Sequence, residues 1–585
     1  MSKTPEKKPR KVNVWRPKAE APVDEAPVEA TAIEPVEKGP AALDVRGLLD
    51  DLRASLQRQD KETFLGLLKD MGRVGFDRIS EYADADRALM IAMSGFIEAA
   101  ASRYAIDPGA QWAPGEPLKL LLAGYSGTRN TGADVRVEEM IRQFRHLFGD
   151  EHVALSIFTL DPELTKGYFR TVRQLELPKL FPKFLFDTIH DQHAVIACEG
   201  SMFKSKFANA LSTMMVGSIG LASAEGKLAI GYGGEAGTMD ESLARLVKKY
   251  CQDALIIARN ENSKKILGEL GVASRSGTDT AWTFDPAPPE VGRKILMDQG
   301  WDGKMPILAL CPINPFWWPV KPHVRRAAVH AATGVYKDSH YGSVYFHKTG
   351  FDVVEAQHVY LGSIATAVVK VLSEGQRFFP VMFGSEQLDR DACESLDRKL
   401  VRRLGAFAPK RADGTKGFPI IVSDEYDMYE MVSAMRQSTY MISSRYHACV
   451  MTMAGGVVSG GVTMDERIRN LMKDRGTPEL ALEVDDPDLY EKTCTMLRTL
   501  ISDADAIREG IDGCVYANLE RMGQMGQILV DHVRKHHPEF PFRPELGEHG
   551  DPWDHLPPLA PAVQQLVERV RARGPKAVPQ LEARA

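Results

Sequence analysis

Cysteine is scarce in this chain, and its pattern excludes two common ways of stabilising a fold. Seven cysteines are scattered through 585 residues, and no two of them form a C-x-x-C pair. A disulfide framework or a structural zinc site normally shows regular, closely spaced cysteines. We therefore expect reduced core thiols of a cytoplasmic protein at Cys198, Cys251, Cys311, Cys393, Cys449, Cys494 and Cys514.

The chain also lacks an excess of positive charge and an apolar leader. Its 73 Lys and Arg residues are outnumbered by 79 Asp and Glu, for a formal net charge of −6. This balance gives no general attraction to nucleic acid or to an acidic membrane. The basic residues near the N-terminus are followed by no apolar segment, so no secretory signal is predicted. We expect a cytoplasmic protein without a transmembrane segment, and association with the inner face of the membrane stays open.

The composition predicts a globular chain of at least two domains. With 44% hydrophobic and 26% charged residues, 585 residues can bury ample apolar surface. The first residues are rich in Pro, Ala, Glu and Lys and poor in large apolar side chains, which is typical of disorder. The predicted organisation is a disordered tail (1–43), a helical module (44–115), an N-terminal Rossmann-like domain (116–290), a C-terminal Rossmann-like domain (291–540) and a Pro-rich tail with a terminal helix (541–585).

Short apolar runs alternate with helical patterns from residue 117 onward. Such alternation predicts parallel sheets covered by helices on both faces. The predicted fold class is therefore α/β, with two Rossmann-like domains facing a cleft and a helical module before them. The predicted strands are 118–123, 153–159, 194–198, 228–231 and 254–258 in the first domain, and 306–311, 378–383, 420–422, 440–443 and 457–462 in the second.

The apolar stretch 440–464 contains the hexad Ser-Ser-Arg-Tyr-His-Ala at 443–448. A charge such as that of Arg445 costs several kcal/mol or more in hydrocarbon, so the stretch is not interpreted as a membrane span. It instead predicts a strand, a polar corner and a helix closed by Gly455 and Gly456. In such a unit the helix-start amides and the guanidinium lie at the carboxyl edge of the sheet, where phosphates and carboxylates bind. The segment predicts an anion site.

Two further polar motifs follow predicted strands of the first domain. The loop 124–132 contains three glycines, but its spacing matches neither the dinucleotide fingerprint nor a Walker loop. The second motif, Arg-Asn-Glu-Asn-Ser at 259–263, stands at the start of a predicted helix that ends at Gly271.

The glycine loop, the segment 258–263 and the segment 444–448 together resemble motifs of the polysaccharide pyruvyl transferase family. Their order and rough spacing agree over about residues 117–480. The resemblance implies an architecture similar to glycosyltransferase type B, with phosphoenolpyruvate as donor and a pyruvyl ketal on a sugar as product. It implies no metal and no cofactor apart from the donor substrate. It also implies that the first domain faces the acceptor and the second the donor.

The sequence departs from the family pattern in the first domain. In the family the last glycine of the loop is usually followed by Asp-Glu, whereas here Ala133 and Asp134 follow Gly132. Either Asp134 replaces that acid or the acceptor differs. The family's glycine triplet after the third strand is replaced by the segment 198–204, and its Gly-Gln-Gly by the segment 231–235.

Chemistry and resemblance together select the candidate residues. Phosphoenolpyruvate carries a carboxylate and a phosphate, which planar guanidinium groups bind in a bidentate manner. An imidazole can hold phosphate when charged or transfer a proton. The predicted catalytic residues are His447, Arg445 and Asp134, with anion binding favoured for His447. The predicted substrate-binding residues are Arg259, Ser444, Gly124, Gly127, Asn130, Gly132, Trp317 and Lys321.

Most of these candidates also have a purely structural interpretation. Arg445 could pair with Asp424 or Glu425, and Arg259 could pair with another acid. The glycines could only permit a tight turn, and the Trp-Pro cluster at 316–319 could pack against its own domain.

Three functional hypotheses remain open at this point. The first is an enzyme that transfers pyruvate from phosphoenolpyruvate to a hydroxyl pair of a saccharide. This saccharide could be free, or it could be linked to a lipid or a nucleotide. The second is a glycosyltransferase that uses a nucleotide sugar. The third is a non-catalytic family member that acts as a binding or assembly module. A homo-oligomer is compatible with each of them.

Overall fold

The computed structural model describes residues 85–322, 345–348, 350–464, 466–547 and 550–574, all within one compact unit that spans Phe76–Ala585. The predicted disordered tail and the part of the helical module before residue 85 lie outside the described residues. So do residues 323–344.

The first sheet contains seven parallel strands in the order β3-β2-β1-β4-β5-β6-β7. Two predicted strands, 118–123 and 153–159, have the observed bounds of β1 and β2. The short strands β3 and β7 were not predicted, because neither contains an apolar run. The strands are β1 (Leu118–Ala123), β2 (Val153–Thr159), β3 (Arg173–Glu176), β4 (Ala194–Ala197), β5 (Leu228–Gly234), β6 (Leu255–Ala258) and β7 (Arg275–Ser276).

The second sheet contains six parallel strands in the order β12-β11-β8-β13-β14-β15. They are β8 (Ile307–Cys311), β11 (Phe379–Gly384), β12 (Ile420–Val422), β13 (Tyr440–Ser443), β14 (Val458–Thr463) and β15 (Ala481–Glu483). The strand order reverses between β1 and β4 in the first sheet and between β8 and β13 in the second. Ligands of open parallel sheets bind beyond the carboxyl ends of the strands at such switch points. The prediction of two Rossmann-like α/β domains is confirmed.

The central strands of the first sheet, β1, β2, β4, β5 and β6, are largely buried on both faces, as their apolar sequences require. In β1, Leu120 and Leu122 pack into one hydrophobic core, while Leu121 and Ala123 pack into the core on the opposite face. The core that contains Leu120 and Leu122 also contains apolar side chains of the second sheet. One continuous hydrophobic core therefore joins the two sheets. This continuity positions the loops at the strand ends against one another.

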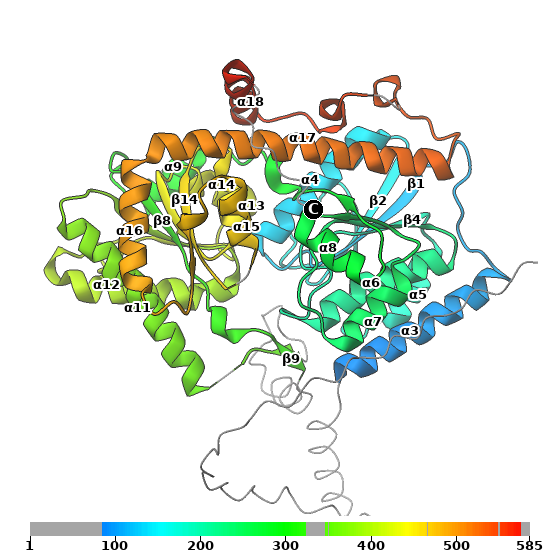
Figure 1. Cartoon of the computed structure of the whole chain (residues 1–585), viewed down its shortest axis with the longest axis horizontal. Helices are drawn as coiled ribbons and strands as arrows, with labels where there is room; N and C mark the ends of the chain where they lie inside the picture. The colour runs from blue at the N-terminus through cyan, green and yellow to red at the C-terminus, as the bar shows by residue number, and fades with distance from the viewer. Residues whose placement is uncertain (1–84, 323–344, 349, 465, 548–549, 575–585) are drawn as a thin grey trace, which may run out of the picture. The chain divides into compact units, whose positions relative to one another are not determined.

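Helices cover both faces of each sheet (Figure 1). In the first, α3 packs against α5, α6 and α7, so this helix forms part of the covering layer of that sheet. The helices that follow or precede strands of the first sheet are α3 (Ala85–Tyr104), α4 (Thr131–Phe148), α5 (Pro182–His190), α6 (Asn209–Ala224), α7 (Glu241–Tyr250) and α8 (Glu261–Glu269). Those associated with the second sheet are α9 (Pro289–Asp298), α11 (Phe351–Ser373), α12 (Arg390–Leu404), α13 (Met428–Met435), α14 (Tyr446–Met453), α15 (Glu466–Asp474) and α16 (Leu489–Ser502).

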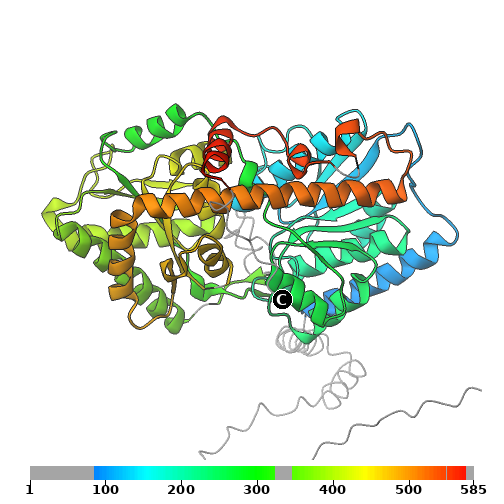
Figure 2. The ribbon, with the colours of Figure 1, turned by 45° about the horizontal axis from the view of Figure 1, so that its top comes forward.

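One long helix, α17 (Ala504–His536), runs alongside elements of both sheets (Figures 1 and 2). It contacts β14 of the second sheet and α4 of the first. Its 33 residues span about 50 Å at 1.5 Å per residue. Ile511, Val515, Leu519 and Met522 recur at helical spacing and are all buried. The helix therefore ties the two sheets together through an apolar stripe, and α18 (Pro561–Arg573) packs on its outer side.

The stretch 440–464 forms β13, α14 and β14, as predicted. Gly456, two residues beyond the C-cap of α14, adopts a φ of 74°, a conformation in which glycine avoids the strain of a Cβ. Among the described residues, no helix combines the length and apolar character needed to cross a membrane. All seven cysteines are free and buried, which confirms the prediction of core thiols.

Candidate functional site

The loop between β1 and α4 meets the corner between β13 and α14. The backbone amide of Thr131 donates a 2.8 Å hydrogen bond to the carbonyl of Ser385, which follows β11. Gly132, in the first turn of α4, lies against His447 so closely that a Cβ at this position would stand 2.3 Å from Nδ1 of the imidazole. Two residues predicted from separate motifs, Gly132 and His447, are thus brought into contact.

The contact between Gly132 and His447 predicts what a methyl group added at position 132 would do. Gly132→Ala is expected to lower catalytic turnover about 10- to 100-fold, because the imidazole must move by the order of an ångström. The free energy of unfolding is expected to change by only about 1–3 kcal/mol. Turnover and urea unfolding of the same preparation measure the two effects.

Gly268→Ala is the matched control, because Gly268 also lies in a helix and a Cβ there would meet nothing within 4 Å. It is expected to leave turnover unchanged and to raise stability slightly. Equal turnover of both variants would contradict the inferred closeness of α4 and His447.

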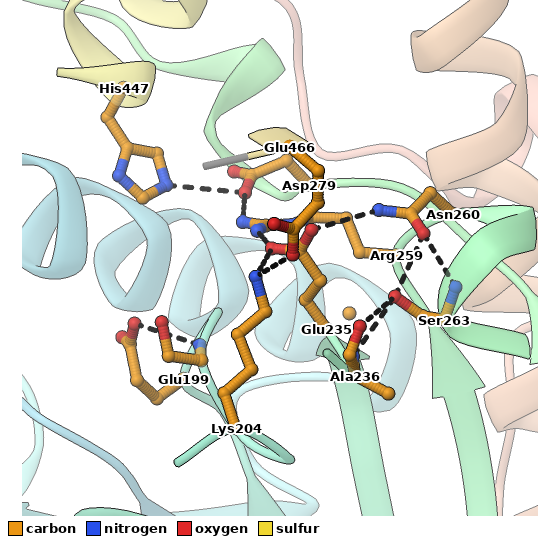
Figure 3. Close-up of polar contacts among 12 residues, drawn as sticks. Glu199, Lys204, Glu235, Ala236, Arg259, Asn260, Ser263, Asp279, His447 and Glu466 are labelled. Carbon is orange, nitrogen blue, oxygen red and sulfur yellow. Dashed lines mark hydrogen bonds and ion pairs between the residues drawn. The ribbon is translucent and has the colours of Figure 1, made fainter. Parts of the chain in front are cut away.

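A buried carboxylate, Asp279, lies at the centre of the candidate site (Figure 3). Its Oδ2 is 3.0 Å from Nε of Arg136, 3.0 Å from Nη1 of Arg259 and 3.3 Å from Nε2 of His447. Burial by itself would raise the pKa of Asp279, but Arg136, His447 and Arg259 outweigh burial and hold this pKa well below its usual value. We refer to Asp279, Arg136, Arg259 and His447 as the Asp279 cluster. It joins the carboxyl end of the first sheet to the β13–α14 corner of the second.

The Asp279 cluster continues into a second buried carboxylate, Glu235, at the end of β5. Nη2 of Arg259 donates to Glu235, and Nζ of Lys204 lies 3.1 Å from the same carboxylate. Lys204 also lies 2.6 Å from Glu466 at the start of α15, so this ion pair connects elements of the two sheets. Asn260 donates to Glu235 at 3.3 Å. Its Oδ1 accepts from the Ser263 amide, which confirms the predicted N-cap of α8.

The environment of His447 favours a neutral imidazole. Burial lowers the pKa of His447 from its ordinary value of 6.5, although Asp279 acts in the opposite direction. Because Asp279 is ionised, Nε2 of the imidazole carries the proton and donates it to the carboxylate, which leaves Nδ1 as an acceptor. This arrangement favours proton transfer over the anion-binding role that the sequence suggested.

Arg445 is held by two acids that sequence reasoning did not select. Its Nε donates to Asp389 at 2.9 Å and its Nη2 donates to Glu386 at 2.9 Å. Burial raises the pKa of Asp389 to about 6, although Arg445 opposes this shift. The acids proposed as structural partners, Asp424 and Glu425, instead bind Arg390. The guanidinium of Arg445 retains some exposure, with 21% of its side chain accessible.

The buried side chain of Asp134 holds the glycine loop in place through a hydrogen bond. Its Oδ1 accepts a 2.9 Å hydrogen bond from the amide of Gly127, whose φ is 80°. Burial raises the pKa of Asp134 to about 7, against the lowering effect of that hydrogen bond. Asn130 caps α4 by accepting from the amide of Ala133. At Gly124 a Cβ would meet Sγ of Cys198 at 2.6 Å, so the glycine permits the close approach of β1 and the end of β4.

The remaining candidates lie elsewhere along the second sheet. Ser444 exchanges a 2.7 Å hydrogen bond with the hydroxyl of Tyr360. Trp317 packs against His347, with ring centroids 4.9 Å apart. Lys321 is exposed in the short strand β9 (Lys321–Pro322), which pairs with β10 (Tyr345–Phe346). None of the described contacts joins these three residues to the Asp279 cluster.

Sequence reasoning missed Asp279, Arg136, Glu235 and Lys204. A signal existed for Arg136, which is a charged residue placed between the apolar residues Val135 and Val137 at the start of a predicted helix. Such a residue must find a buried partner. Asp279 offers no comparable pattern, because its partners come from α4, β6 and α14. Among the described residues, no group of His, Cys, Asp or Glu side chains is arranged to hold a metal ion.

Among known families, one family model matches the central part of the chain. The family model described as polysaccharide pyruvyl transferase matches residues 221–465, less than half of the 585 residues. The matched segment includes Arg259, Asp279, Arg445 and His447, whereas the glycine loop lies outside it. The comparison with curated proteins gives no match.

Several solved structures are similar to this chain at low sequence identity. UDP-GlcNAc 2-epimerase from Neisseria meningitidis, bound to UDP-GlcNAc, has 10% identity and a TM-score of 0.42, covering 71% of this chain and 99% of its own. The MnaA–UDP structure from S. aureus has 9% identity and a TM-score of 0.41, with coverage of 72% and 97%. ADP-heptose lps heptosyltransferase II from E. coli has 10% identity and a TM-score of 0.31, with coverage of 66% and 99%.

The fold assignment itself rests on the two parallel sheets and their strand orders. The motif predictions at 258–263 and 444–448 both fall within the segment that the family model matches. Residues 221–465, which carry Arg259, Asp279 and His447, match the model of the polysaccharide pyruvyl transferase family.

Proposed function

We propose that this protein transfers pyruvate from phosphoenolpyruvate to two hydroxyl groups of a saccharide, with release of phosphate. The family match supports a role in polysaccharide modification. The observation that carries the finer proposal is the Asp279 cluster, which brings His447 and Arg259 to one buried carboxylate at the junction of the two sheets. We propose that the acceptor is a saccharide linked to a lipid or a nucleotide, and that the reaction takes place in the cytoplasm.

The reaction requires one proton to be added and two to be removed. The methylene carbon of phosphoenolpyruvate gains a proton, and one sugar hydroxyl adds to carbon 2. A second hydroxyl then displaces the phosphate, so that its oxygen closes the ketal and its proton leaves with the phosphate. A neutral imidazole can accept a proton from a hydroxyl, and Nδ1 of His447 is the acceptor that the hydrogen bond to Asp279 leaves available.

The donor is an anion with two recognition groups, and arginine suits both of them. In the structure Arg259 already pairs with Glu235 and Asp279, and Arg445 pairs with Glu386 and Asp389. An incoming phosphate or carboxylate therefore competes with these acids for the guanidinium groups. Protonation of Asp389, whose pKa burial raises to about 6, would release part of Arg445 for the donor.

The test is phosphate release from phosphoenolpyruvate in the presence of a panel of cell-envelope saccharides. Release that depends on a saccharide, together with an increase in the mass of the saccharide by one pyruvyl ketal, is the expected result. Saccharide transfer from a nucleotide sugar with no use of phosphoenolpyruvate would establish the glycosyltransferase instead. Binding of phosphoenolpyruvate without turnover on any saccharide would favour the assembly module.

A further inference from the structure

The C-terminal half of α12 and the turn that follows it carry an excess of positive charge. Residues 398–416 contain seven Lys and Arg and one acid, whereas the whole chain has a net charge of −6. Arg398 and Arg411 are paired with acids. Within the described part of the chain, the other five form no ion pair with an acid: Lys399, Arg402, Arg403, Lys410 and Lys416. We refer to these five residues, together with Phe407, as the basic surface.

Three of these charges share one face of α12. Lys399 precedes Arg402 by three positions and Arg403 by four, and residues at these spacings are neighbours on a helix. Lys399 donates to Nδ1 of His358 at 2.8 Å, and Nε of Arg403 donates to the hydroxyl of Thr366 at 2.9 Å, so neither is neutralised by an acid. The pKa of Lys399 is lowered, chiefly by burial and further by its arginine neighbours. Like charges at these spacings destabilise a helix.

Two further charges face each other across the turn after α12. Lys410 and Lys416 are partners in an antiparallel bridge, and the backbone hydrogen bonds on either side of them make this a non-hydrogen-bonded pair. Side chains lie closest together in such pairs, and like charges directly opposite each other are destabilising. Nζ of Lys416 also lies 3.5 Å from the carbonyl of Gly405, which places this charge beside the segment that contains Phe407.

Phe407 lies within this run of charges and is 90% exposed, more than any other large apolar side chain of the described residues. It ends the short 3-10 helix η4 (Gly405–Phe407), in which Ala406 is also exposed and no residue is buried. Arg403 precedes this segment and Lys410 follows it. The turn therefore presents an apolar tip between cationic side chains.

A bilayer that contains anionic lipids matches both features of the basic surface. Its headgroups attract Lys and Arg side chains. The boundary between headgroups and acyl chains takes up exposed aromatic and aliphatic side chains. A single-stranded nucleic acid also offers negative charge, but the proteins that bind one stack its bases on several rings along a basic groove. The basic surface is instead a projecting turn with one ring.

We propose that the basic surface docks this protein on an anionic membrane, with Phe407 inserted below the headgroups and the neighbouring cations placed among them. The inference goes beyond the proposed function and does not depend on it. Adjacent like charges and an exposed aromatic ring both lower the stability of the free chain. Both are relieved when anionic headgroups surround the charges and the ring leaves water.

The basic surface and the candidate site lie at opposite ends of α12. This helix packs on α11 and on the strands β11 and β12, at one edge of the second sheet (Figure 1). It begins directly after Asp389, which binds Arg445, and its 15 residues span about 22 Å. Docking through the C-terminal end of α12 therefore leaves the candidate site uncovered.

The test is sedimentation of the full-length chain with lipid vesicles, without phosphoenolpyruvate or saccharide. We expect binding to phosphatidylcholine vesicles that contain about one third phosphatidylglycerol, no binding to phosphatidylcholine alone, and weaker binding at high salt. The double variant Arg402→Gln/Arg403→Gln is expected to weaken partition into the anionic vesicles about 10- to 30-fold, because two charges near the headgroups are lost. Phe407→Ala is expected to weaken it about tenfold, because the inserted ring is lost.

Matched variants away from the basic surface control for charge and apolar exposure. Arg245→Gln/Lys248→Gln removes the same charge from two exposed residues of α7, and Ile106→Ala shortens an apolar side chain that is 89% exposed. Both are expected to bind the anionic vesicles as the wild-type chain does.

Each outcome decides for or against the membrane. Weakening that is confined to the two variants of the basic surface supports the inference. The inference is overturned if the wild-type chain does not bind the anionic vesicles, if these two variants bind as well as wild type, or if the control variants weaken binding equally. Binding of a single-stranded oligonucleotide in place of the vesicles would also overturn it and give the surface a nucleic-acid partner. Pyruvyl transfer to a dissolved saccharide should be the same in all these variants, so loss of either property is seen independently of the other.

Discussion

His447→Ala is expected to lower pyruvyl transfer by at least about 100-fold while the chain stays folded. Loss of a group that moves a proton or stabilises charge in a closed site typically costs roughly 2–4 kcal/mol of activation free energy. The fold should tolerate the change because the imidazole is neutral and Asp279 keeps two other partners, Arg136 and Arg259. Saccharide-dependent phosphate release measures the activity, and circular dichroism measures the fold.

His358→Ala provides the comparison, since His358 is an exposed histidine on α11 and its ring lies 2.8 Å from Lys399 at the surface. It should retain wild-type transfer. A His447→Ala enzyme with more than about a tenth of wild-type transfer would remove His447 from the mechanism.

The largest loss of stability is expected for Asp279→Ala. This variant leaves Arg136 and Arg259 buried without their shared carboxylate, and breaking a buried ion pair from one side costs about 3–5 kcal/mol. Glu235 still faces Arg259, so the larger part of the cost should arise at Arg136, whose side chain is fully buried. Urea unfolding followed by fluorescence measures the change.

Asp298→Ala removes a carboxylate from a 2.6 Å ion pair with Lys294 in which both side chains are exposed. It should cost less than about 1 kcal/mol. If Asp279→Ala is no more destabilising than Asp298→Ala, then the Asp279 cluster is solvated and cannot organise a site.

The effect of Asp279 should also depend on pH in one direction. Its pKa in the folded chain is held well below the ordinary value of 3.8, so the unfolded chain binds more protons in the acidic range. The stability that Asp279 contributes is therefore complete above about pH 5. It is lost as the pH falls below the ordinary pKa of 3.8 toward the lower pKa of the folded chain. The difference between wild type and Asp279→Ala should shrink accordingly in strong acid.

The elements of the fold were largely predictable because they depend on local patterns. Strands such as β1 and β13 are short apolar runs, and α14 follows a polar corner and is followed by two glycines, so local patterns suffice to find them. The N-cap of α14 is Arg445, and no serine side chain caps this helix. The strands β3 and β7 escaped prediction since their residues are polar or few, and only pairing with a neighbouring strand defines them. The apolar stripe of α17 is also a local pattern, but the pattern does not say that this helix contacts both sheets.

For the candidate site, the sequence by itself determined the polar corner at 443–448, the capped helix start at Asn260 and the glycine loop, since each is a local pattern of residues. Only the tertiary structure decided which charges meet. Asp279 is one aspartate among many until Arg136, Arg259 and His447 approach it from separate elements. Likewise, Gly132 gains its importance from the imidazole beside it. The physical reason is that burial and charge pairing are properties of distances between elements far apart along the chain, and these distances set the protonation of His447 and the partners of both arginines.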